Sequence, residues 1–78
     1  MDKVERAHQS KRLMDDDTLI SAFDGVSSAC VAVMSNHAST DEQVLEARRE
    51  LLALNRVKSR LASFIADGRI EQKRKSGP

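Results

Sequence analysis

The chain has few cysteines and aromatic residues: its 78 residues include one cysteine and two phenylalanines, with no tryptophan or tyrosine. A single cysteine excludes an internal disulfide, and no cluster of Cys and His has the spacing of a structural zinc site. The shortage of aromatic rings argues against a β architecture and against a surface that stacks single-stranded bases. So short a chain buries little apolar surface and needs a further source of stability. With disulfides and metals excluded, oligomerisation or docking onto a partner is the source that is left.

The chain also lacks the apolar segments that direct proteins to membranes. Its amino terminus carries charges at Asp2, Lys3 and Glu5 instead of the apolar core of a secretory signal. No run of apolar residues approaches the ~20 needed to span a bilayer. These absences predict a cytoplasmic protein with a reduced thiol and no membrane partner.

What the sequence does contain is two apolar ladders of helical spacing. Their members recur every three and four residues, a spacing that keeps one face of a helix toward a neighbouring helix. Two such ladders joined by a short polar break predict an all-α fold, an antiparallel hairpin of two long helices preceded by a short N-terminal helix. The predicted hairpin core consists of Leu19, Phe23, Val26, Cys30, Val33, Val44, Leu51, Leu54, Leu61 and Ile65.

The first two helices are placed by acidic residues and by the polar break. A weak apolar stripe predicts the short helix over residues 2–13, and the second helix follows over residues 17–36. The three aspartates at 15–17 are typical of a helix start, where carboxylates accept backbone N–H groups and meet the positive end of the dipole. Gly25 weakens the second helix locally, so we expect a bend there.

The third helix is the longest. Ser39 and Glu42 match the S-x-x-E capping box and predict a start near Thr40. Gly68 suits the left-handed residue that follows a helix end, which places that end near Asp67. Residues 1–70 then form a single helical domain, and the basic residues 71–78 form a disordered tail.

No constellation of residues predicts catalysis, a cofactor or a metal. Cys30 lies on the apolar ladder, where a buried thiol is poorly reactive. His8 and His37 lie in polar segments without suitably spaced carboxylates. Lys58 occupies a ladder position, where its stem packs and its ammonium group reaches water. We therefore predict that the chain is not an enzyme and has no catalytic residues.

Positive charge is concentrated in the second half of the chain. Residues 40–78 contain nine Lys or Arg and six Asp or Glu. Such residues could bind phosphates weakly and in a salt-sensitive way, but no short-turn recognition-helix pattern accompanies them. The candidate phosphate contacts are Arg56, Arg60, Arg69, Lys73, Arg74 and Lys75.

Three segments carry a family resemblance: K-R-L-M-D-D-D-T-L-I-S-A-F at 11–23, A-R-R-E at 47–50 and I-A-D-G-R at 65–69. Over residues 7–70 the chain resembles a group of short, mostly uncharacterised proteins encoded by tailed bacteriophages and prophages. The resemblance implies a setting, a phage-encoded accessory or virion protein in the host cytoplasm, and no particular activity.

Apolar residues also lie outside the two ladders. They would leave a second stripe partly exposed, and such a stripe usually meets a third helix or another subunit. The predicted function is a structural or assembly protein that packs with itself or with a larger virion component. A small regulator or inhibitor that binds a host protein is the alternative, and a nucleic-acid accessory protein is the third. The sequence also allows a monomer whose core is completed by its N-terminal helix. The candidate partner interface is Ile20, Val31, Leu45, Leu52 and Phe64.

Overall fold

The computed structural model describes residues 2–77, and within this range the chain forms three helices and no strand. They are α1 (Lys3–Met14), α2 (Asp17–Ser35) and α3 (Asp41–Ser76). At 1.5 Å per residue the 36 residues of α3 extend about 54 Å. This helix therefore sets the length of a molecule that measures 61 × 22 × 18 Å. The prediction of an all-helical chain is confirmed.

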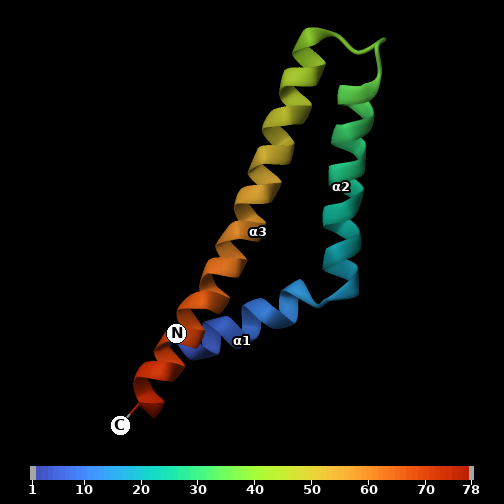
Figure 1. The fold of residues 1–78 in the computed structure, drawn as a ribbon. Helices are drawn as coiled ribbons and strands as arrows, with labels where there is room; N and C mark the ends of the chain where they lie inside the picture. Colours follow the sequence, from blue (N-terminus) through green and yellow to red (C-terminus); the bar gives the residue numbers. More distant parts are fainter. Residues whose placement is uncertain (1, 78) are drawn as a thin grey trace.

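The three helices outline a narrow triangle (Figure 1). Helices α2 and α3 descend from the loop at 36–40, lie closest beside that loop and diverge away from it. Helix α1 crosses the open end, and its contact with α3 is more extensive than that of α2 with α3. The short N-terminal helix is therefore a principal part of the packing.

Aspartates begin the first two helices. The Asp2 carboxylate accepts the backbone N–H groups of Val4 at 2.6 Å and Glu5 at 3.3 Å. At the start of α2, Asp16 accepts the Leu19 N–H at 2.9 Å. Both contacts satisfy donors that the first helical turn leaves free. The expectation that the aspartates at 15–17 start a helix is confirmed, with Asp16 as the N-cap.

Helix α3 begins with a capping box one residue later than the sequence predicts. The Thr40 hydroxyl accepts the Gln43 N–H at 3.1 Å, and the Gln43 side chain accepts the Thr40 N–H at 2.9 Å. The predicted cap, Ser39, instead donates its N–H to the Asn36 carbonyl at 2.9 Å, in the turn that leaves α2. The prediction of Ser39 with Glu42 is wrong because the loop turn engages Ser39.

The end of α3 is the largest departure from prediction. The helix continues through Gly68 to Ser76, and no described residue has a positive φ. Gly68 is buried where α1 crosses: a Cβ there would overlap the Ala7 methyl group and lie 3.0 Å from the Lys3 carbonyl oxygen. The glycine permits a close approach of two helices. The predicted disordered tail is therefore wrong for residues 71–76, because α1 supports this segment; Met1 and Pro78 lie outside the described residues.

The core is thin. Among the described residues the buried apolar ones are Ala7, Cys30 and Ala47, and no large side chain is fully buried. Of the ten predicted core residues, Cys30 is buried, and Val26 is exposed, at 44% of its surface. The assignment of Val26 to the core is wrong because α2 makes the less extensive of the two contacts with α3, and this packing leaves the Val26 side chain uncovered. The others are half-buried: Leu19, Phe23, Val33, Val44, Leu51, Leu54, Leu61 and Ile65.

Helix α2 passes through Gly25 as a single helix and is the most apolar of the three. Its 19 residues are long and apolar enough to cross a membrane, judged by length and composition, and few of them are buried. Asp24 lies in the middle of this helix. The expectation that the chain has no membrane partner stays a prediction.

Candidate protein–protein interface

The molecule exposes more surface than a compact chain of its size. Its accessible surface is 6183 Å², whereas about 4,700 Å² is typical of an 8.7 kDa folded monomer. Its radius of gyration is 17.1 Å, against about 11.5 Å for a globular chain of this length. The excess of about 1,500 Å² is larger than the ~800 Å² that each partner buries in a standard interface.

Much of the exposed surface is apolar. Of the predicted partner residues, Ile20, Val31, Leu45 and Leu52 are exposed, whereas Phe64 is half-buried. The full set of exposed large apolar side chains is Leu13, Ile20, Val26, Val31, Leu45, Leu52, Val57 and Ile70. Single exposed apolar residues are ordinary on a protein surface, but eight on so small a chain make them the candidate residues for a partner contact.

Phe64 is covered by two arginines. The Arg6 guanidinium lies 5.1 Å from the ring centroid, and that of Arg60 lies 5.8 Å from it. Both distances are in the range of cation–π attraction. Arg6 comes from α1, so this contact joins the two ends of the chain, and no local sequence pattern indicates it.

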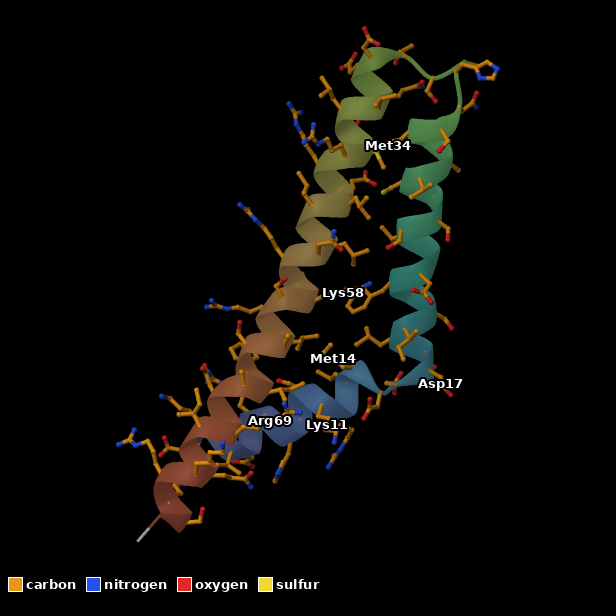
Figure 2. The ribbon with its side chains drawn as sticks, viewed as in Figure 1. Lys11, Met14, Asp17, Met34, Lys58 and Arg69 are labelled. Carbon is orange, nitrogen blue, oxygen red and sulfur yellow. The ribbon has the colours of Figure 1, made fainter. Side chains whose placement is uncertain are left out.

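Lys58 points into the space between the long helices. Its ammonium nitrogen lies 5.6 Å from the centroid of the Phe23 ring, and Figure 2 shows the side chain reaching from α3 toward α2. A small, mostly apolar pocket lies beside it, at the corner where α1 meets α2, and includes Leu13, Met14 and Ile20. The half-buried lysine occupies the position where an apolar ladder residue would close the hairpin.

The single thiol is buried and lies beside a carboxylate. The Cys30 Sγ donates a weak hydrogen bond to Glu50 at 3.6 Å. Burial raises the pKa of the Cys30 thiol, and the hydrogen bond and charge of Glu50 raise it further. His8 and His37 are both exposed. Within residues 2–77 no group of three potential metal ligands comes together.

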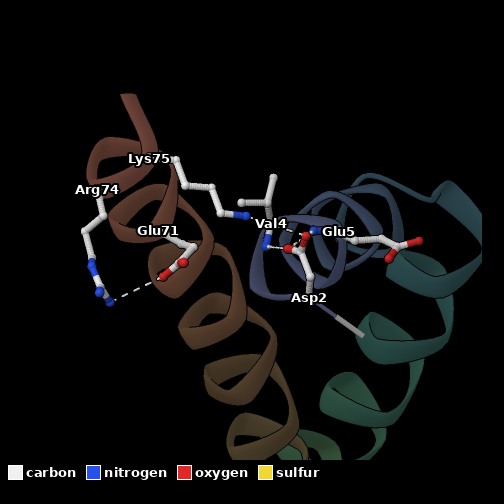
Figure 3. Close-up of polar contacts among 6 residues, drawn as sticks. All are labelled: Asp2, Val4, Glu5, Glu71, Arg74 and Lys75. Carbon is white, nitrogen blue, oxygen red and sulfur yellow. Dashed lines mark hydrogen bonds and ion pairs between the residues drawn. The ribbon is translucent and has the colours of Figure 1, made fainter. Parts of the chain in front are cut away.

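The six candidate phosphate contacts are exposed and do not form one patch. At about 100° per residue they are distributed around α3. Two of them form ion pairs within the chain: Lys75 Nζ lies 3.7 Å from Asp2, and Arg74 lies 3.6 Å from Glu71 (Figure 3). The two backbone N–H groups at the start of α1, followed by Lys75, lower the pKa of Asp2. Lys75 therefore adds an exposed contact between the end of α3 and the start of α1.

No family model, curated protein or solved structure matches this chain.

Proposed function

We propose that this chain is a non-enzymatic structural or assembly protein that acts through helix packing, with itself or with a larger virion component. Its working unit is the antiparallel hairpin of α2 and α3, braced at the open end by α1. The observation that carries this proposal is the large, partly apolar surface of a chain whose own core is thin.

Energetics favour a partner. Fully burying an exposed Val, Leu or Ile side chain contributes about 1.5–3 kcal/mol, so covering the exposed halves contributes on the order of 1 kcal/mol each. A small domain has only a few kcal/mol of net stability. Association that covers several of these side chains would therefore raise stability substantially. The resemblance to short phage proteins supplies the setting, the host cytoplasm or the virion.

A second candidate function is membrane association through α2, which is supported by the length, apolar composition and low burial of that helix. Asp24 opposes it, since a carboxylate at the bilayer centre costs about 2.5–3.5 kcal/mol. Capture of a host protein by the same apolar surface remains the alternative partner. Nucleic-acid binding ranks lower because the cations are dispersed around α3.

Light scattering of the purified full chain across a dilution series tests the proposal, together with flotation on anionic and neutral vesicles. We expect an oligomer whose mass falls on dilution, and no flotation. A chain that stays monomeric at every concentration and floats with vesicles would support the membrane function instead. A chain that stays monomeric and does not float would contradict self-assembly.

A further inference from the structure

One flank of α3 carries a regularly spaced stripe, which we call the α3 stripe: Glu46, Glu50, Ala53, Val57, Arg60 and Phe64. Its spacings of four, three, four, three and four residues keep all six on one side of the helix. Phe64 is half-buried and the other five are exposed. The six positions are symmetric about residue 55, but the side chains on its two sides differ in charge. Glu46 and Glu50 lie before residue 55, whereas Arg60 and the arginine-covered ring of Phe64 lie after it.

This arrangement suits an antiparallel copy of the same helix. If two α3 helices cross at residue 55, Ala53 of one lies against Val57 of the other, and Glu50 lies against Arg60. The same crossing brings Glu46 to the Phe64 end of the stripe, beside α1, where it meets the guanidinium groups of Arg6 and Arg60 that lie over the ring. In a two-fold dimer each contact occurs twice.

The charge along the whole of α3 favours the same orientation. Residues 41–50 contain four acids and two arginines, whereas residues 56–75 contain seven Lys or Arg and two acids. An antiparallel pair brings the acidic end of one helix beside the basic end of the other, and a parallel pair brings like charges together. Complementary potentials of this kind determine orientation and register.

The two-fold axis that passes residue 55 of α3 also passes the middle of α2. The contacts of Cys30 with Glu50 and of Lys58 with Phe23 place residue 55 of α3 level with residues 25–26 of α2. A groove near the loop, lined by Val33 and by the stripe residues Glu46 and Glu50, shows which flank of α2 lies on the same side.

That flank of α2 is formed mainly by small residues. Around the centre at 25–26, the antiparallel crossing pairs Ala22 with Ala29 and Gly25 with Val26. A Cβ at Gly25 would meet nothing within 4 Å, so space is open there. Small residues let two helices approach closely. The 44% exposure of Val26 fits the same picture, because the second copy, rather than α3, would cover it.

We propose that the chain forms a two-fold antiparallel homodimer in which the α3 stripe packs against its copy and the small flank of α2 packs against its copy. The result is a four-helix bundle of α2, α3 and their symmetry mates. The two faces include Val26 and Val57 of the exposed large apolar side chains, and the excess surface of the whole chain, about 1,500 Å², exceeds the ~800 Å² that each partner buries in a standard interface. This inference rests on the proposed assembly function and names its partner, a second copy.

The test is a charge exchange in the full chain, with the dimer dissociation constant measured by sedimentation equilibrium. We expect Glu50→Arg and Arg60→Glu each to weaken the dimer about tenfold, because each places two like-charge pairs in the interface. The double variant restores the opposite pairs and is expected to return the constant to within about threefold of the original. Arg48→Glu makes the same charge change on the opposite side of α3 and is the matched control; it should leave dimerisation unchanged.

Rescue by the double variant distinguishes the interface from local effects. Glu50→Arg also removes the contact with Cys30, and Arg60→Glu also removes the contact with Phe64. The second substitution cannot restore either of these contacts within the chain, so only an interface between copies explains rescue. Circular dichroism of all variants should show equal helix content. A dimer insensitive to both single changes, or a double variant without rescue, overturns this interface and leaves self-assembly standing. If the wild-type chain is monomeric at every concentration, both the antiparallel dimer and self-assembly are overturned. If that monomer also floats with vesicles, the result supports membrane association through α2.

Discussion

Replacing Gly68 with alanine sets two effects of known sign against each other. Alanine is favoured over glycine inside a helix by about 1 kcal/mol. The new methyl group, however, overlaps that of Ala7 and lies 3.0 Å from the Lys3 carbonyl oxygen. Neither neighbour can yield by rotating a flexible side chain, because one is a Cβ and the other belongs to the backbone. Helix α1 must therefore move away as a body.

The steric term should prevail. Overpacking of this kind costs about 1–3 kcal/mol, and carbon atoms need about 3.5–4.0 Å between them. Outward movement of α1 also weakens the Arg6 contact with Phe64 and the Lys75 contact with Asp2. We expect a net loss of up to about 2 kcal/mol, the overpacking cost less the helix gain, with the helix content of α3 unchanged.

Urea unfolding followed by circular dichroism measures the free energy, and limited trypsin digestion reports the docking of α1, which contains Lys3, Arg6, Lys11 and Arg12. Gly25→Ala, measured at a concentration at which the chain is monomeric, is the matched control, because within one chain its methyl group meets nothing within 4 Å; there it should stabilise the chain by about 1 kcal/mol. Ala7→Gly added to Gly68→Ala should recover part of the loss. If Gly68→Ala is as stable as Gly25→Ala and α1 stays resistant to trypsin, the close crossing of α1 and α3 is refuted.

Three further predictions concern single side chains. Leu54→Ala should lower the free energy of unfolding by about 1–3 kcal/mol, since the side chain is half-buried. His37→Ala, in the exposed loop, should leave the urea midpoint unchanged. If His37→Ala were the more damaging variant, the packing of the apolar ladder of α3 would be contradicted. The lowered pKa of Asp2 means that its stabilisation of α1 is present above the unfolded pKa and is lost as the pH falls below about 4. Amide exchange of α1 should rise there, and Asp2→Asn should flatten that pH dependence; equal slopes in both chains would count against it. The raised pKa of Cys30 predicts slower alkylation at pH 8 than in the urea-unfolded chain, and Glu50→Gln should speed the folded-state reaction; equal folded and unfolded rates would disprove the protected thiol.

Local chemistry accounts for what was predictable here. The ladder spacing, the aspartates before α2 and the polar break at 36–40 act within one or two helical turns, so the sequence by itself determined three helices and nearly all their starts. Even the error at Ser39 was one residue, since Ser39 and Thr40 both offer a capping hydroxyl and the turn from Asn36 decided between them.

Tertiary structure decided the rest, because it depends on residues that lie far apart in the chain. Gly68 resembles a helix end until α1 is placed across it, and the basic segment resembles a disordered tail until Lys75 meets Asp2. The ladder likewise assigns Val26 to the core, yet the limited contact of α2 with α3 leaves its side chain exposed. A periodic pattern shows which side of a helix is apolar. Which neighbour covers that side is settled by helix crossing and spacing, and these are properties of the packed molecule.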